Sequence, residues 1–126
     1  MTSSMIRCLL AVLALSETYT QVATKDVAQL LGLTRPTVHR TLGILQEHGL
    51  IYKAPYGDIH LSDEGRRTAR QLERRRDDLA IRLSRDYGIA MDECAKAAVV
   101  LLGELSEESL RKISEWEGDV KSEERG

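Results

Sequence analysis

Hydroxyl and guanidinium side chains gather between residues 34 and 41, next to a proline. A guanidinium can donate two parallel hydrogen bonds to guanine, while a threonine hydroxyl can bond a phosphate or a base and its methyl group can contact thymine. On a helix, the free backbone N–H groups of the first turn also attract phosphate. This chemistry predicts a surface that contacts DNA, and its predicted members are Thr34, Arg35, Pro36, Thr37, Arg40 and Thr41.

The elements that must hold this surface follow a helix-turn-helix pattern. Apolar periodicity and capping residues predict helices over residues 4–16, 25–31 and 35–48. Thr24 and Thr34 are the predicted N-caps of the second and third helices, and Gly32 ends the second. This order projects the third helix outward, in the arrangement that enters a major groove.

Two short extended segments, 50–54 and 59–61, flank a cluster of turn residues and predict a β-hairpin wing. Lys53 and Tyr56 are the predicted DNA contacts of this wing. An ammonium group there attracts phosphate, which adds affinity and salt dependence but little sequence information. A winged-helix module that binds protein instead of DNA is the alternative that the residues leave open.

The C-terminal half predicts three more helices, over residues 63–87, 91–102 and 107–117. Their apolar residues exceed what one winged domain needs, which predicts a homodimer interface, with packing inside the chain as the alternative. The predicted interface residues are Val99, Leu101, Leu102, Leu105 and Leu110. The predicted fold is mainly α: a winged helix-turn-helix domain (three helices and a two-stranded β-hairpin) at 1–63, a helical dimerisation domain at 64–117 and a disordered tail at 118–126.

Composition argues against other classes of function. The chain has neither a nucleophile–base arrangement nor a glycine-rich phosphate loop, so we do not expect an enzyme. Two distant cysteines, Cys8 and Cys94, make no disulfide framework and suit a reducing cytoplasm. The apolar run 8–15 is far short of a bilayer span, so we expect no membrane partner.

The net charge of -2 conceals two oppositely charged parts of the chain. Residues 1–85 hold thirteen basic and nine acidic residues, a balance of +4, whereas residues 86–126 hold five basic and eleven acidic ones, a balance of -6. Near-neutrality therefore does not count against double-stranded DNA as a partner, because the location of the charges decides the local field.

Three stretches, 33–41, 47–51 and 59–65, together with the arginine-rich helix that follows them, carry a family resemblance. Over residues 4–114 the chain resembles the diphtheria toxin repressor and manganese transport regulator family of metal-dependent bacterial repressors. The resemblance implies a winged helix-turn-helix followed by a helical dimerisation domain, a DNA operator as partner, and manganese or iron as cofactor. It also implies operator contacts at Thr34, Pro36, Thr37 and Arg40.

The metal ligands of that family do not carry over to this chain. By the resemblance, the ligand positions fall at Arg7, Arg76, Val99, Leu102 and Gly103, with second-site positions at Ala80 and Ala95. None of these residues is the carboxylate or imidazole that divalent manganese or iron requires. Three alternatives follow: fixed charge at Arg7 and Arg76 replaces the metal or binds an anion, an apolar effector binds between the first and fifth helices, or Glu93 and Cys94 form a poorer site.

Overall fold

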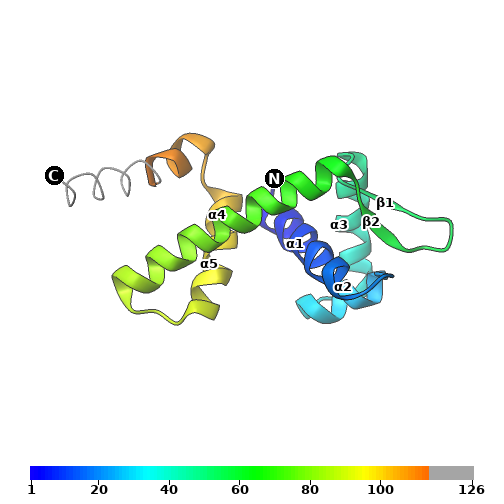
Figure 1. The fold of residues 1–126 in the computed structure, drawn as a ribbon, viewed down its shortest axis with the longest axis horizontal. Helices are drawn as coiled ribbons and strands as arrows, with labels where there is room; N and C mark the ends of the chain where they lie inside the picture. Colours follow the sequence, from blue (N-terminus) through cyan, green and yellow to red (C-terminus); the bar gives the residue numbers. More distant parts are fainter. Residues whose placement is uncertain (114–126) are drawn as a thin grey trace.

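The computed structural model describes residues 1–113 and is built mainly from helices. In chain order the elements are α1 (Ser3–Thr18), α2 (Thr24–Leu31), α3 (Arg35–Glu47), β1 (Ile51–Lys53), β2 (Ile59–Leu61), α4 (Asp63–Tyr87) and α5 (Met91–Glu104). A further helical segment begins at Glu107 and is described to Ile113. The molecule is elongated, with the β1–β2 wing at one end and the far ends of α4 and α5 at the other (Figure 1). The predicted fold class, a winged helix-turn-helix followed by a helical part, is confirmed.

Local hydrogen bonds explain where the helices of the DNA-binding unit begin and end. The Thr34 side chain accepts a hydrogen bond from Thr37 N, so the predicted N-cap of α3 is confirmed. Gly32 ends α2 with a φ of 67°, a conformation that glycine adopts without steric cost. The prediction for α2 is wrong by one residue: Ala23 is the N-cap, because the Asp26 carboxylate accepts from Ala23 N at 2.9 Å.

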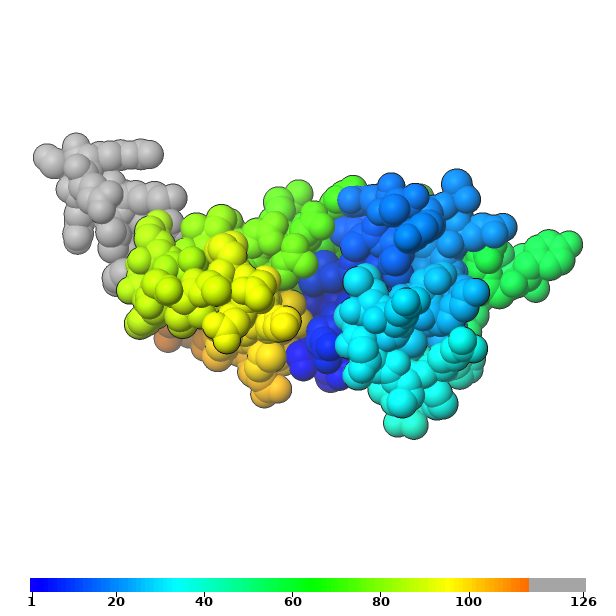
Figure 2. Space-filling model, turned by 90° about the horizontal axis from the view of Figure 1, so that it is seen from below, coloured from blue at the N-terminus to red at the C-terminus, as the bar shows by residue number. Residues whose placement is uncertain are grey.

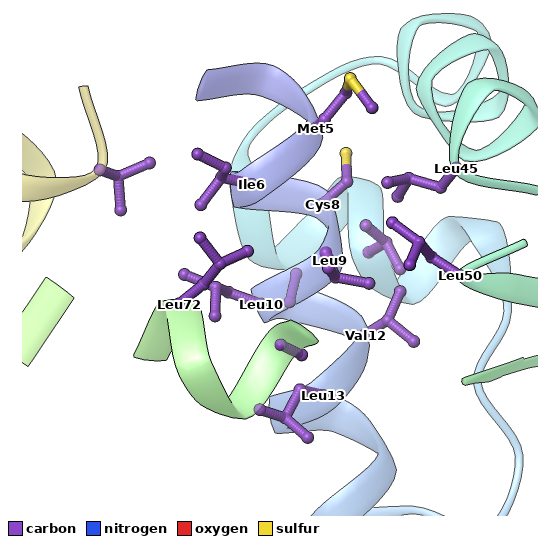
Figure 3. Close-up of a cluster of buried hydrophobic side chains, with 14 of the residues drawn as sticks. Met5, Ile6, Cys8, Leu9, Leu10, Val12, Leu13, Leu45, Leu50 and Leu72 are labelled. Carbon is purple, nitrogen blue, oxygen red and sulfur yellow. The ribbon is translucent and has the colours of Figure 1, made fainter. Parts of the chain in front are cut away.

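Helix α1 forms the centre of the core and packs on α2, α3, α4, α5 and β2. Leu9, Val12 and Leu13 have no exposed surface. Leu45 and Leu50 approach α1 from one side, and Leu72 of α4 approaches from the other (Figure 3). Because α1 packs against elements at both ends of the molecule, the buried residues of the described part of the chain make one continuous cluster.

The wing is an antiparallel pair in which Ile51, Tyr52 and Lys53 face Leu61, His60 and Ile59 in that order. Each strand has three residues, so β1 is shorter than the predicted 50–54, and β2 matches its prediction. Ile59 N donates to the carbonyl of Val22 at 2.8 Å, which ties the segment before α2 to the wing. Strand β2 is therefore bonded to β1 on one edge and to the segment before α2 on the other, while the exposed Tyr56 marks the tip of the hairpin.

The start of α4 is fixed against the residues that follow α3. The Ser62 hydroxyl donates to the carbonyl of Gly49 at 2.6 Å and accepts from Gly65 N at 2.9 Å. Helix α4 also approaches the residue before β1 so closely that a Cβ added at Gly65 would lie 1.8 Å from the Leu50 carbonyl oxygen. A glycine at this position is therefore required by the crossing between α4 and the wing.

The C-terminal apolar residues are largely covered by the chain itself. Val99, Leu102 and Leu110, three of the predicted dimer contacts, are only 6 to 8% exposed. Leu101 and Leu105 are half-buried against the same core. Packing inside the chain, the alternative to dimerisation, accounts for these side chains, and a partner could not touch the three buried ones without a rearrangement.

Ion pairs and hydrogen bonds hold the segment after α5 on α4. Arg75 donates two hydrogen bonds to the Glu107 carboxylate, at 2.6 and 3.1 Å, and Arg82 donates to the carbonyl of Ile113. Ser106 caps this segment, since its hydroxyl accepts from Ser109 N at 3.1 Å. The predicted end of this helix at residue 117 and the predicted tail 118–126 lie outside the described residues.

Candidate nucleic-acid interface

Helix α3 has one buried face and one exposed face. Val38, Leu42 and Leu45 lie inward with no exposed surface. The α2–α3 region forms a rounded lobe beside the projecting wing (Figure 2). The apolar face thus anchors the helix, and polar side chains remain on its free surface. The exposed predicted contacts on that surface are Thr34, Arg35, Pro36, Thr37 and Arg40.

Three threonine hydroxyls at the start of α3 bond to the helix and to one another. Thr34 Oγ1 and Thr37 Oγ1 lie 2.8 Å apart, and Thr41 Oγ1 donates to the Thr37 carbonyl at 3.2 Å. Each hydroxyl has one proton to donate. One hydroxyl of the Thr34–Thr37 pair therefore remains a donor for phosphate, while Thr41 has already used its proton.

Thr41 differs from the other predicted contacts because it is half-buried against α1. Its partner there is Cys8, which is 1% exposed. Burial raises the pKa of the Cys8 thiol, and this outweighs the opposite effects of the Arg7 charge and of a hydrogen bond with Thr41. Thr41 thus joins the recognition helix to α1, and Cys8 is a neutral packing group beneath it.

The wing meets the recognition helix through a side-chain pair. Lys53 Nζ lies 3.2 Å from Nδ1 of His39, which is on the flank of α3 that faces β1. Tyr52 and His60 stack across the two strands, with ring centroids 5.2 Å apart. Tyr56 is 95% exposed at the tip. His39 is not among the DNA contacts predicted from the sequence, although its position four residues after Arg35, on the polar side of the helix, was a usable signal.

The cations of this surface are available to an external anion. Within residues 1–113, no carboxylate forms an ion pair with Arg35, Arg40 or Lys53. By contrast, Arg70 of α4 binds Glu17 at 2.7 Å, so part of the positive charge on α4 is neutralised within the chain. Arg35, Arg40 and Lys53 therefore leave unneutralised positive charge on α3 and β1, where phosphate charge would be favourable.

The positions aligned with the metal ligands of the resembling family hold other interactions. Arg7 donates to the Leu31 carbonyl at the end of α2, at 3.4 Å, and Arg76 pairs with Asp77 on its own helix at 3.0 Å. The two arginines therefore bind separate local partners. A Cβ added at Gly103 would lie 2.5 Å from the backbone nitrogen of Ser3, because α1 begins directly against α5.

The donor set of this region does not fit a divalent metal. In the described part of the chain, no three His, Cys, Asp or Glu side chains cluster in a way that could hold a metal ion. Val99 and Leu102 face the core, and Cys94 is buried with its thiol 3.5 Å from the Ile89 carbonyl.

None of the helices within residues 1–113 is both long and apolar enough to cross a membrane.

Known proteins share both the helix-turn-helix and the larger fold. Residues 7–55 match the family of IclR helix-turn-helix domains. Among solved structures, the chain is similar to the manganese regulator SloR, with a TM-score of 0.78 and 21% identity over 94% of this chain and 55% of that one. It is also similar to a manganese-dependent transcriptional repressor in complex with manganese, with a TM-score of 0.74 and 28% identity over 90% and 52%. A third similar structure is IdeR of T. acidophilum, with a TM-score of 0.67 and 22% identity over 94% and 55%.

The chain spans about half the length of these three solved structures. No curated protein sequence matches it. The neighbours are metal-dependent regulators, as the motifs of residues 33–65 had predicted, whereas the IclR type of the helix-turn-helix was not anticipated. Residues 7–55 are therefore similar to IclR-type helix-turn-helix domains, and the chain as a whole shares its fold with solved structures of manganese-responsive regulators.

Proposed function

We propose that this protein is a transcriptional regulator, acting as a repressor in the cytoplasm, that binds double-stranded DNA through α3 and the wing. The observation that carries this proposal is the exposed row of hydroxyl and guanidinium groups on α3, held outward by a fully buried apolar face, with Lys53 beside it. An α-helix fits the major groove, where arginine and threonine can bond base edges. A wing ammonium adds attraction to phosphate.

Salt-titrated binding to DNA tests the proposal. A duplex selected from a random pool by the full chain should bind more tightly than a mixed-sequence duplex, and affinity for both should fall steeply as salt rises. Arg40→Ala should lower affinity for the selected duplex by about tenfold and reduce the preference over mixed sequence. Arg111→Ala, which removes an exposed arginine far along the chain, is the matched control. Failure to bind any duplex would leave a protein-interaction module as the better assignment.

We also propose that the protein is a homodimer, and the exposed apolar residues of the α4–α5 hairpin support this. These side chains are between 40 and 74% exposed although they are large and apolar. A symmetric dimer that covers them would place its two recognition helices so that they can enter the major groove on successive turns of the duplex. The residues are Ile81, Tyr87, Ile89, Met91 and Val100.

Sedimentation of the full chain tests dimerisation. Ile81→Glu and Val100→Glu should each shift the protein toward the monomer, because a carboxylate at an apolar interface loses its hydration. Tyr19→Glu changes an equally exposed apolar residue at the end of α1 and should leave the dimer intact. A monomer at all concentrations for the unchanged protein would refute the dimer.

We further propose that DNA binding needs no metal at the positions used by the resembling family. Two observations support this: those positions hold arginine, aliphatic and glycine residues, and α1 and α5 cross closely at Gly103. DNA affinity should be unchanged by a chelator and by added manganese, iron or zinc. A large gain with one metal would refute the proposal. An unchanged affinity with metal, together with a gain from a small apolar compound, would instead identify a non-metal effector.

A further inference from the structure

The pair formed by His39 and Lys53 sets the protonation pattern of an imidazole on the recognition helix. Lys53 Nζ lies 3.2 Å from His39 Nδ1. An ammonium group can only donate hydrogen bonds, so Nδ1 must accept, and the proton of the neutral ring is then on Nε2. His39 is exposed, and its ring therefore offers solvent a hydrogen-bond donor rather than an acceptor.

We propose that His39 is a further DNA-contacting residue, which donates from Nε2 to an acceptor on the duplex, and that Lys53 positions it for this contact. The inference rests on the proposed function of α3 and the wing. The hydrogen-bond acceptors that DNA offers to such a donor are mainly the phosphate oxygens and, in the major groove, the acceptor atoms of guanine, adenine and thymine. His39 lies between the helix and the wing, so a duplex that touches both elements passes over its ring.

The same contact positions Lys53. The lysine side chain is long and flexible, and a bond to the imidazole reduces the conformations that its ammonium can adopt. The ammonium is then held between α3 and β1, next to the outer face of the recognition helix. Histidine and lysine consequently act as one unit that couples the wing to the helix.

His48 at the end of the same helix supplies an internal control. Its Nδ1 lies 2.8 Å from the carbonyl oxygen of Ile44, which can only accept. Nδ1 of His48 must therefore carry a proton. When neutral, the two histidines of this region should have opposite tautomers: Nε2–H at His39 and Nδ1–H at His48.

Nitrogen-15 NMR of the histidine rings tests the first half of the proposal without DNA. At about pH 8, where neutral imidazole prevails, the full chain should show the Nε2–H form at His39 and the Nδ1–H form at His48. Lys53→Met keeps the aliphatic stem and removes the ammonium. It should remove the preference of His39 for the Nε2–H tautomer and leave the tautomer of His48 unchanged. A predominant Nδ1–H form at His39 in the unchanged protein would overturn the proposal.

Two amide substitutions separate the roles of the two ring nitrogens. Asparagine can replace the Nδ1 acceptor but lacks the outer donor, whereas glutamine can extend an N–H donor to about the place of Nε2. His39→Asn should weaken DNA binding about tenfold, and His39→Gln should stay within about threefold of the unchanged protein. His48→Asn should have no effect. Equal losses for Asn and Gln, or no loss for Asn, would overturn the donor role.

Comparing two duplexes identifies the acceptor. A loss for His39→Asn on both the selected and the mixed-sequence duplex assigns a phosphate oxygen, and a loss on the selected duplex alone assigns a base. The double variant His39→Asn with Lys53→Met should lose less than the product of the single losses, because the residues act as a unit. Independent losses would overturn the coupling. If the unchanged chain bound no DNA, the proposed function would fail with this contact, and the tautomer measurement would still decide the His39–Lys53 pair.

Discussion

At the scale of single residues, one hydroxyl can connect two elements. Ser62 caps α4 through Gly65 N and also donates to the Gly49 carbonyl, at the turn between α3 and β1. The cap satisfies a backbone donor that has no partner within the helix. Its second bond joins the recognition helix to the start of α4, so Ser62 contributes to the position of the wing as well as to helix stability.

We predict that Ser62→Ala lowers the free energy of unfolding by about 1 to 2 kcal/mol, because both hydrogen bonds are lost. Denaturation by urea with circular dichroism measures the change. Ser106→Ala removes a cap whose hydroxyl bonds only within its own segment, and should cost less. An equal cost for the two variants would show that the Gly49 bond contributes nothing.

At the scale of elements, close backbone approaches set how the helices cross. Gly65 lets α4 pass over Leu50, and Gly103 lets α5 meet the start of α1 at Ser3. A side chain at either position would have to displace backbone, which cannot move without moving its element. These two crossings fix the wing and the helical part relative to α1.

We predict that Gly65→Ala destabilises the protein by about 3 kcal/mol, since its Cβ would overlap the Leu50 carbonyl. Gly43→Ala is the matched control in α3, where an added Cβ meets nothing within 4 Å. It should stabilise by about 0.5 to 1 kcal/mol through the higher helix propensity of alanine. The midpoints of thermal unfolding should move in opposite directions, and a shift in the same direction would contradict the crossing argument.

The segment after α5 should respond to acid. A hydrogen bond with Arg75 lowers the pKa of Glu107 below its ordinary value of 4.5, although the carboxylate is exposed. A lowered folded-state pKa means that the pair stabilises the segment above that ordinary value and loses this effect as the pH falls through the lower one. The protection factors of the amides of residues 107–113, which correct hydrogen exchange for its intrinsic pH dependence, should therefore fall at acid pH. Glu107→Gln should remove this pH dependence, and an unchanged dependence would point to another group.

At the scale of the whole molecule, α1 packs against elements of both predicted domains. Ile6 and Leu10 are buried with Leu72 on the side away from Leu45, while Cys8 lies beneath α3 (Figure 3). Charge divides differently from packing, since the basic excess is in residues 1–85 and the acidic excess in residues 86–126. A single apolar cluster therefore connects the basic part of the chain to the described portion of the acidic part.

We predict that residues 1–63 alone do not form a stable domain, because removal of α4 and α5 exposes the far side of α1. The full chain should unfold in one cooperative transition by circular dichroism and by amide NMR. The fragment should show poor amide dispersion and no cooperative transition. A well-dispersed spectrum from the fragment would contradict this prediction and show that residues 1–63 fold on their own.

Much of the local structure was predictable from sequence. Thr34 begins α3 and Gly32 ends α2 as expected, and α4 spans the predicted residues 63–87. These signals act between neighbours in the chain, through capping bonds and the conformations allowed to glycine. The error at Thr24 has the same local origin, because Asp26 supplied a competing hydrogen bond to Ala23.

By itself the sequence determined the order of the helices, the hairpin and the polar face of α3, because these depend on residues a few positions apart. Tertiary structure alone decided which faces meet. It buried Val99, Leu102 and Leu110 inside the chain, directed Arg7 to the end of α2, and brought Lys53 to His39, fourteen residues away. Such pairs depend on how several helices pack at once, and no local spacing specifies that packing.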